Sequence, residues 1–423
     1  MIKILDYSQL KEEIFARQEI SIDVEGIVKG ILNDVEKNGD KALYYYAEKF
    51  DKCKLDSLLV SEQEFDEAFS SVDAEFIDIL KKASENIKEF HSKQVRQGFE
   101  IRKENGVVLG QKITPIERVG LYVPGGTAVY PSTVLMDSIP AKIAGCKEIC
   151  MTTPPNNQGK INANILVAAK IAGIDKVYKV GGAQAVGALA FGTQTIGKVD
   201  KIVGPGNAFV AEAKRQVFGK VNIDMIAGPS EILIIADEKS NAKHIASDLL
   251  SQAEHDKMAS AVLVTDSQQL AKKVQSELEN QLKDLPRSEI ARQSLDTNGK
   301  IIVAKDLNEV IKVSNEIAPE HLELMVDNPF DYLDKITNAG SIFMGRYCPE
   351  VLGDYYAGPN HTLPTSGTAR FSSPLSVDDF IKKSQYMYYT QSALKEVYKD
   401  VAYFANKEGL QAHGNSAKVR FED

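Results

Sequence analysis

Four of the six histidines lie in short polar segments in the second half of the chain, each beside other groups that bind metals or move protons. The segments are 252–255, 320–321, 354–361 and 408–413. Imidazole has an unperturbed pKa near neutral pH and is the commonest metal ligand among side chains. His91 and His244 lie instead in helical patterns. This distribution predicts one assembled site and favours an enzyme.

The first and third segments, with His413, offer a set of metal ligands. Gln252 and His255 are three residues apart in a predicted helix, so both side chains should project from one face. With Asp354 and His413 they supply two nitrogens and two oxygens, which zinc accepts. Each residue also has an ordinary alternative: a core or surface pair, a turn former, or a histidine in a disordered tail. The four cysteines lack CxxC spacing, so neither a thiolate zinc site nor a disulfide framework is indicated.

Glu320 and His321 place two bases of different intrinsic strength side by side. They follow Pro319, which disfavours helix for the residue before it, so the pair should open a new element. A general base is most useful when its pKa lies near the working pH, which favours His321 for a first proton transfer. The ordinary alternative is a pair at a helix end in water.

The composition excludes several functional classes. The chain has 423 residues, 43% of them hydrophobic, and a formal net charge of −9, which argues against nucleic acid or an acidic membrane as partner. No apolar run reaches 18 residues, and the N-terminus resembles neither a signal nor a transit peptide. A soluble cytoplasmic protein of two or more domains is the simplest interpretation.

Strands alternate with helices over most of the chain. Residues 1–105 are predicted to be mostly helical, and between 106 and 230 short apolar runs end in glycine before small-residue helices. Further on, strands are predicted at 231–236, 261–265, 300–304, 322–326 and 341–345, and helices at 242–255, 267–285, 307–317 and 329–338. This alternation predicts two doubly wound α/β units with parallel sheets. A long loop at 346–375 implies a functional role, and a charged helical tail follows from about 376.

Three glycine-rich turns follow predicted strands, at 120–126, 181–182 and 204–206. In open α/β sheets such turns let the backbone approach a ligand, and helix N-termini favour phosphate. They indicate a nucleotide or another anion, although G-x-G-x-x-G and Walker sequences are absent. The ordinary alternative is that the glycines only make tight turns.

Eight motifs in these segments resemble the histidinol dehydrogenase family. They are GLYVPGG from 120, GGAQA from 181, GPGNAFV from 204, GPSE from 228, DLLSQAEH from 248, PEHL from 319, GDY from 353 and GPNH from 358. The resemblance runs from about 25 to 415. It implies an NAD-dependent, zinc-containing homodimer that oxidises L-histidinol to L-histidine, the last step of histidine biosynthesis, with two NAD+ and one water.

The family also implies a fold and a division of the chain. The expected α/β fold has two incomplete Rossmann-like, aldehyde-dehydrogenase-like domains with smaller helical extensions, in a domain-swapped dimer. The expected division is an N-terminal extension at 1–25, a catalytic domain at 26–110 and 231–370, an NAD-side domain at 111–230, and a C-terminal helical extension at 371–423 that contributes to the partner subunit's site.

The family's functional residues match positions in this chain. The implied zinc ligands, for one ion per subunit, are Gln252, His255, Asp354 and His413. The implied catalytic pair is Glu320, which activates water, and His321, which takes the alcohol proton. The implied substrate contacts are these ligands and His321 together with Ser230, His361 and Glu408, and the implied NAD+ contacts are Tyr122, Gln184 and Asn207.

Three alternatives remain open. An aldehyde can be oxidised through a thiohemiacetal on an activated cysteine, which makes Cys146 a candidate, although it follows the apolar Ile143-Ala144 and is expected to be buried. The chain could instead be a binding protein that senses histidinol, histidine or NAD without turnover. A third alternative is a dehydrogenase for another amino alcohol or for a sulfonated alcohol.

Overall fold

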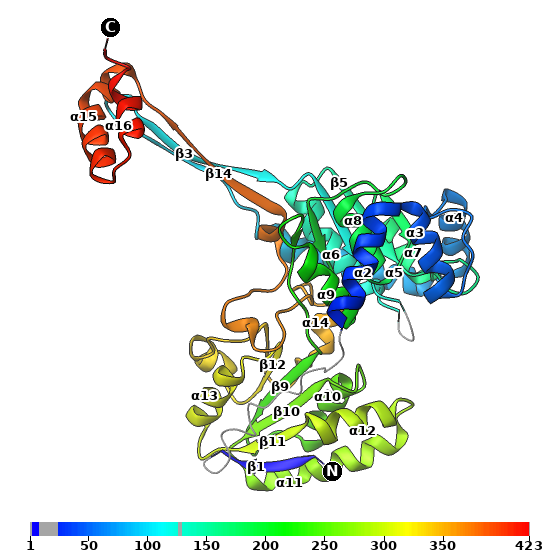
Figure 1. The fold of residues 1–423 in the computed structure, drawn as a ribbon. Coiled ribbons are helices and arrows are strands. Elements are labelled where there is room, and N and C mark those ends of the chain that lie inside the picture. The colour runs from blue at the N-terminus through cyan, green and yellow to red at the C-terminus, as the bar shows by residue number, and fades with distance from the viewer. Residues whose placement is uncertain (1, 8–23, 126–128, 423) are drawn as a thin grey trace. The chain divides into compact units, whose positions relative to one another are not determined.

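The structure, a computed structural model, describes residues 2–7, 24–125 and 129–422. The chain divides into two compact units, the first made of Met1–Gln94 and Ile116–Phe380 and the second of Val95–Pro115 and Ile381–Asp423 (Figure 1). Within the described ranges, no helix has the length and apolar character needed to cross a bilayer. Gly126, the last glycine of the first predicted turn, lies outside the described residues.

The first unit contains a five-stranded parallel sheet with the order β6-β5-β4-β7-β8. Its strands are β4 (Arg118–Tyr122), β5 (Glu148–Thr153), β6 (Lys176–Lys179), β7 (Lys201–Val203) and β8 (Asn222–Ile223). The chain adds two strands on one side of β4 and then two on the other. The order therefore reverses between β4 and β7, the position at which doubly wound sheets bind ligands.

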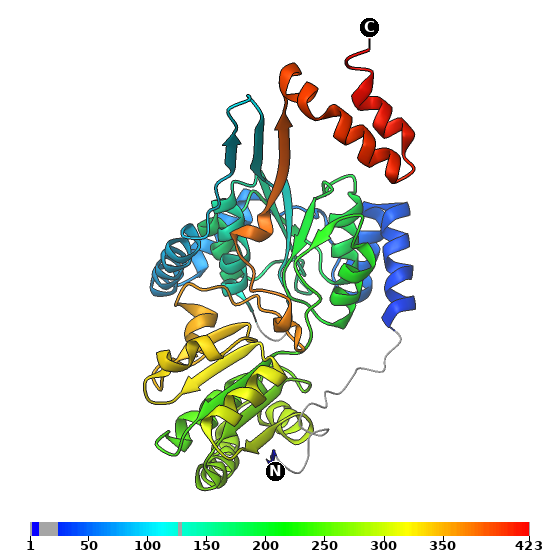
Figure 2. The same ribbon diagram turned by 90° about the vertical axis from the view of Figure 1, so that its left-hand side faces the viewer.

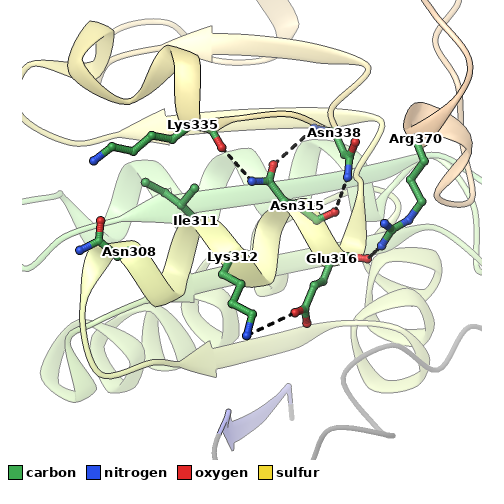
Figure 3. A pocket seen from close by; sticks show the side chains of 8 residues that line it. All are labelled: Asn308, Ile311, Lys312, Asn315, Glu316, Lys335, Asn338 and Arg370. Atoms are coloured by element: carbon green, nitrogen blue, oxygen red, sulfur yellow. Dashed lines mark hydrogen bonds and ion pairs between the residues drawn. The ribbon is translucent and has the colours of Figure 1, made fainter.

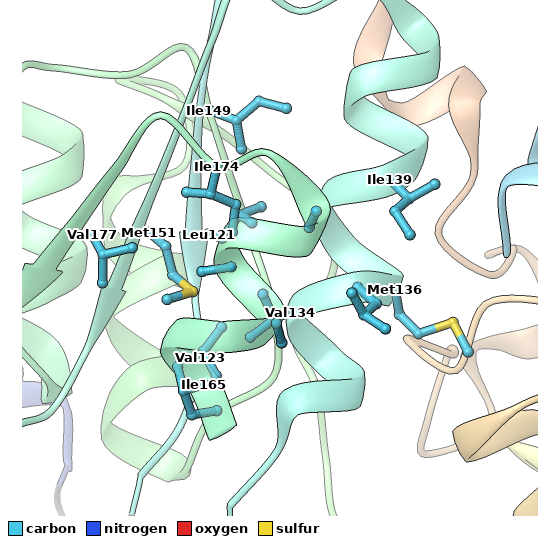
Figure 4. Packing of buried hydrophobic residues seen from close by; sticks show 14 of the residues in the cluster. Leu121, Val123, Val134, Met136, Ile139, Ile149, Met151, Ile165, Ile174 and Val177 are labelled. Atoms are coloured by element: carbon cyan, nitrogen blue, oxygen red, sulfur yellow. The ribbon is translucent and has the colours of Figure 1, made fainter. Parts of the chain in front are cut away.

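Helices cover both faces of this sheet. They are α2 (Val24–Asn38), α3 (Asp40–Tyr46), α4 (Glu62–Ser71), α5 (Ala74–Ser92), α6 (Pro131–Ala144), α7 (Ala163–Ala172), α8 (Gly182–Phe191) and α9 (Ala208–Val217), with a π-helical turn η1 (Ala47–Asp51). Because side chains alternate along a strand, Val119 and Leu121 of β4 join the core with α4 to α7, whereas Tyr122 joins the core with α2, α3, α8 and α9. Figure 4 shows Leu121 packed in the first of these cores. The helices of 24–92 thus pack on this sheet, whereas the sequence division placed 26–110 with 231–370.

The first unit also contains a six-stranded parallel sheet with the order β1-β11-β10-β9-β12-β13. Its strands are β1 (Lys3–Asp6), β9 (Glu231–Ala236), β10 (Ser260–Thr265), β11 (Lys300–Val303), β12 (His321–Met325) and β13 (Ser341–Met344). The last five repeat the order of the other sheet. The prediction of two parallel doubly wound sheets is confirmed, and β1 extends the second sheet from the expected N-terminal extension.

Helices lie on both faces of this sheet as well (Figure 2). One core contains α10 (Ala242–Ala253), α11 (Gln268–Gln281) and α12 (Ser288–Thr297), and the other contains α13 (Leu307–Ile317). The first predicted helix of this half was too long, since α10 ends at Ala253 rather than 255. The predicted helix at 329–338 is a 3-10 helix, η3 (Pro329–Lys335), and η2 (Leu282–Asp284) follows α11.

The predicted loop at 346–375 contains a short helix, α14 (Val351–Tyr355), and a 3-10 turn, η4 (Thr368–Arg370), and a further 3-10 turn, η5 (Val377–Phe380), follows it. The second unit combines an antiparallel sheet of β2 (Phe99–Arg102), β3 (Val108–Pro115) and β14 (Ile381–Tyr388) with α15 (Gln391–Lys407) and α16 (Gln411–Lys418). The prediction of helix from 376 was wrong over β14. Almost all of β14 is exposed in the single chain, so its side chains carry no inside–outside pattern.

Candidate active site

Glu320 and His321 lie where α13 gives way to β12. Helix α13 ends at Ile317, and the next residue, Ala318, has a left-handed φ of 53°, a conformation that glycine usually supplies at this position. Pro319 follows, and β12 begins at His321. Gly340 passes so close that a Cβ there would lie 2.5 Å from the Glu320 carbonyl oxygen. The prediction that the pair opens a new element is confirmed.

His321 is held as a neutral base. Its Nδ1 lies 3.0 Å from the carbonyl oxygen of Glu231, and because a carbonyl only accepts, Nδ1 carries the hydrogen. The other nitrogen, Nε2, is buried without a hydrogen-bond partner among the described residues and lies 3.9 Å from Oδ1 of Asp354. Burial lowers the pKa of His321 from its ordinary value. The ring therefore presents a lone pair at Nε2.

Glu320 is a buried carboxyl group beside this ring. Its Oε2 accepts the backbone N–H of Glu231 at 2.8 Å and lies 3.7 Å from Nδ1 of His321. Burial raises the pKa of Glu320 well above its usual range, and the nearby acids Glu231, Asp354 and Glu350 raise it further. A carboxylate in such surroundings binds a proton strongly, as a base acting on water must.

Asp354 and His361 are joined through the backbone of α14. The Asp354 carbonyl oxygen accepts Nδ1–H of His361 at 3.1 Å, which leaves Nε2 to accept the hydroxyl of Thr133 at 3.2 Å. The carboxylate of Asp354 lies 3.7 Å from Nδ1 of His361. Burial lowers the pKa of His361, so this second ring is also held neutral. A ligand reaches its Nε2 only by displacing the Thr133 hydroxyl.

Asp354 also belongs to a group that could hold a metal ion. One ligand atom each from His321, Glu350 and Asp354 lie within 4.8 Å of one another. Glu350 is buried and accepts the hydroxyl of Ser251 at 3.1 Å, and burial raises its pKa to about 8. Of the four expected zinc ligands, only Asp354 belongs to this group.

Two other expected ligands come from the end of α10. Gln252 lies in its last turn, and its Oε1 is buried without a hydrogen-bond partner among the described residues. His255 lies beyond the helix end, where its backbone N–H reaches the Gln252 carbonyl at 3.2 Å. The helix therefore ends before His255, and the expectation that both side chains project to one side stays a prediction. His255 still lies near enough to lower the pKa of His321 and His361.

The remaining expected substrate and metal residues are Ser230, in the first unit, and Glu408 and His413, in the second unit. Ser230 directly precedes β9, and its carbonyl accepts the N–H of Ser260 at 2.9 Å. Glu408 caps α15 and His413 lies in α16, so both belong to the second unit, where they are exposed in the single chain.

The expected NAD+ contacts follow strands of the five-stranded sheet. Tyr122 ends β4, and its hydroxyl accepts the N–H of Gly182 at 3.1 Å. Gln184 lies buried in the first turn of α8. Asn207 is exposed and caps α9 through hydrogen bonds from Phe209 and Val210. All three lie at the carboxyl edge, where doubly wound sheets bind nucleotides.

A separate pocket of about 390 Å³ lies on α13, away from these residues (Figure 3). The polar residues that line it form hydrogen bonds with one another: Asn315 donates to the Lys335 carbonyl and accepts the backbone N–H of Asn338. No expected site residue lines it. Its polarity is explained by hydrogen bonds within the fold.

Cys146 and Cys150 are not placed to act as nucleophiles. Cys146 and Cys150 are buried, and burial raises the pKa of these thiols to about 11 and about 12. A reactive cysteine needs the opposite shift and an accessible sulfur. The expectation that Cys146 is buried is confirmed.

We therefore expect the Cys146→Ala variant to retain turnover within about threefold of wild type, since the thiol stays protonated at neutral pH. Steady-state NADH formation measures this, with the melting temperature as the control for folding. Turnover below about a thousandth of wild type in folded, metal-loaded protein would instead establish a thiol route.

Sequence reasoning missed three contributors: Glu231, Glu350 and Thr133. Glu231 orients both catalytic candidates through its backbone, Glu350 adjoins Asp354, and Thr133 holds His361. A weak signal existed for the first, because an acid opens the otherwise apolar strand Glu231–Ala236. Contacts made by backbone atoms do not depend on residue type, so no sequence pattern reveals them. Thr133 is far from His361 in sequence, so no local pattern links the two.

The fold has two parallel doubly wound sheets, and the site has a neutral buried histidine beside a buried carboxyl group whose pKa is raised. Oxygen and nitrogen groups able to hold a metal lie next to this pair. Together these features define an α/β enzyme with an acid–base site. A family model described as histidinol dehydrogenase matches residues 15–421. The chain is 58% identical to the histidinol dehydrogenase of Clostridium acetobutylicum, over 93% of this chain and 92% of the relative. It is 56% identical to that of Bacillus cereus, over 95% and 93%.

A solved structure agrees. The crystal structure of histidinol dehydrogenase from Elizabethkingia anophelis matches with a TM-score of 0.94 and 42% identity, over 99% of this chain and 97% of that one. The chain belongs to the histidinol dehydrogenase family of oxidoreductases.

Proposed function

We propose that this enzyme oxidises L-histidinol to L-histidine through histidinal, with two NAD+ and one water. The observation that carries the proposal is the pairing of His321, neutral with a free Nε2, with the strongly basic carboxylate site of Glu320. An oxidation of alcohol to acid removes two hydrides and needs one base for the alcohol and one for water.

His321 accepts the hydroxyl proton in both oxidations, and Glu320 accepts the proton of the attacking water. In the first oxidation, Nε2 of His321 takes the hydroxyl proton while hydride leaves the carbon for NAD+, which yields the aldehyde. Glu320 then takes a proton from the water that adds to the aldehyde, while His321 returns its first proton to the aldehyde oxygen, which gives the neutral hydrate. In the second oxidation, the resulting hydrate loses a hydroxyl proton to His321 and a hydride to a second NAD+. Both bases return their protons to solvent before the next cycle.

The chain can supply most of a zinc site. We assign Gln252, His255 and Asp354 as ligands, with His413 of the partner subunit as the fourth. The unpartnered Oε1 of Gln252 supports this assignment, because a buried amide oxygen without a donor is an expensive feature unless it binds a ligand. When bound, such an ion would anchor and orient the substrate by binding the nitrogen atoms of histidinol.

Histidinol is further held, in this proposal, by Ser230, His361 and the partner's Glu408. His361 offers Nε2 once the rotatable Thr133 hydroxyl moves aside. NAD+ binds across the carboxyl edge of the five-stranded sheet with Tyr122, Gln184 and Asn207 beside it. Gln184 is buried and the Tyr122 hydroxyl is held by a hydrogen bond, so both side chains are fixed in place before the cofactor binds.

The exposed surface of the second unit is an argument for a homodimer in which each chain contributes its C-terminal segment to the other. Its exposed large apolar side chains in the single chain are Val95, Phe99, Ile101, Tyr386, Met387, Tyr388, Tyr389, Val401, Tyr403, Phe404, Leu410 and Val419. Apolar surface gathered on so small a unit marks an interaction surface. We propose that a second copy covers it and receives His413 and Glu408 in its site.

The decisive measurement is NADH formed per L-histidinol consumed, with zinc content determined on the same sample. We expect a ratio near two, because both hydrides leave one substrate molecule. A ratio near one would show that free aldehyde is the product, and no NADH from zinc-loaded protein would indicate a binding protein. Other amino alcohols and sulfonated alcohols serve as competing substrates.

A further inference from the structure

Glu323 is a fully buried acid within an otherwise mostly apolar strand. It lies two residues after His321 on β12 and is 0% exposed. Because side chains alternate along a strand, Glu323 and His321 project from the same face. A buried carboxyl group is costly unless it is hydrogen-bonded, so its contacts indicate why the fold keeps it.

One oxygen of Glu323 holds the start of α14. Its Oε1 accepts the backbone N–H of Glu350 at 2.8 Å, and Glu350 is the residue directly before this helix. Asp354 lies four residues further along, within the same short helix. The bond therefore links the strand that carries His321 to the helix that carries Asp354.

The carboxyl group of Glu323 also neighbours an acid of α10. Oε2 of Glu323 is buried and receives no bond from a donor within the described part of the chain, and the neighbouring acid is Asp248. Two carboxyl groups in contact keep a proton between them. Consistently, burial raises the pKa of Glu323 well above its usual range and that of Asp248 to about 6. Asp248 lies one turn before Gln252.

The short helix α14 has little freedom to shift. A Cβ at Gly353 would lie 2.7 Å from the ring of Phe343, so glycine is needed for this close approach. That ring lies 6.0 Å, centre to centre, from the ring of His321. The Ser251 hydroxyl bonds to the Glu350 side chain from the α10 side. Helix α14 is thus tied to both β12 and α10.

We propose that Glu323 is a positioning residue that sets Asp354 and Gln252 at the spacing needed for metal binding around His321. It does so through its hydrogen bond to the N-terminus of α14, while its carboxyl group neighbours Asp248 of α10. This inference rests on the proposed zinc site. It concerns a residue that touches neither the substrate nor the metal.

The test compares zinc affinity, measured by competition with a chelator, in the folded full-length enzyme. We expect Glu323→Leu to weaken zinc binding by about 10–100-fold, the usual effect of losing a group that orients ligands. Glu323→Gln retains an acceptor for Glu350 and a donor for Asp248, so it should restore affinity to within about threefold of wild type. The matched control is Leu324→Ala, on the opposite face of the same strand. It should lower the melting temperature without changing zinc affinity.

Wild-type zinc affinity in folded Glu323→Leu would overturn the positioning role while leaving the zinc site intact. Absence of zinc binding by the wild-type enzyme would overturn the proposed site and this inference with it. If Glu323→Leu does not fold, Asp248→Ala on a half-buried helix face takes its place. We then expect a loss of several-fold, and unchanged affinity would refute the proposal.

Discussion

Replacing His321 with asparagine should lower kcat by about 10²–10⁴-fold, the usual contribution of a positioned general base. The amide of asparagine still donates a hydrogen bond towards the Glu231 carbonyl, which His321 contacts at 3.0 Å, but the lone pair of Nε2 is lost. The variant therefore removes the proton acceptor while it keeps the orienting bond. Single-turnover measurement of the first NADH formed isolates the alcohol step.

His244→Asn is the matched control, since that side chain is exposed on α10 and should leave kcat unchanged. Zinc content and melting temperature of both variants establish that the folded, loaded enzyme is compared. A folded, zinc-loaded His321→Asn enzyme with turnover within threefold of wild type would assign the alcohol proton to another group.

His413→Ala should abolish metal retention and turnover, yet mixed dimers with His321→Ala should recover activity. In such a dimer, one site combines the intact His321 of one chain with the intact His413 of the other, while the second site lacks both. One of the two sites is therefore complete, and activity per dimer should approach half of wild type. Differently tagged subunits, purified through both tags, provide the mixed dimer for measurement.

The control is a mixed dimer of two His321→Ala chains carrying the two tags, which should stay inactive. Zinc per mixed dimer should be about one, since only one site has all four ligands. Full loss of activity in correctly formed mixed dimers would show that His413 serves its own subunit. Recovered activity would show that the second unit completes the site across the dimer.

Many helices and strands of this fold could be predicted from local sequence patterns. The strand Glu231–Ala236 and the helix Leu307–Ile317 have the predicted bounds, because apolar runs and helical spacing follow directly from burial. The strand β14 was mistaken for helix because its sequence carries no such pattern in the single chain. Likewise, Gln252 and His255 were predicted on one helix, since sequence spacing does not show where α10 ends.

The candidate site, too, was predicted in part from the sequence and decided in part by the tertiary structure. Residue types and motif order identified Glu320, His321, Asp354 and His361, because acid–base chemistry needs these groups. Only the tertiary structure decided that Glu320 and His321, the proposed catalytic pair, lie at the start of β12 beside Glu231 at the start of β9, at the amino edge of the sheet. The nucleotide-side residues lie at the carboxyl edge of the other sheet.

The sequence alone thus determined the chemistry available to this protein and the elements that carry it. The tertiary structure decided which groups meet: Glu231 with the catalytic pair, Thr133 with His361, and Glu323 with Glu350. The physical reason is that a local pattern reports whether a side chain is buried, whereas its pKa and tautomer depend on neighbours supplied by distant segments.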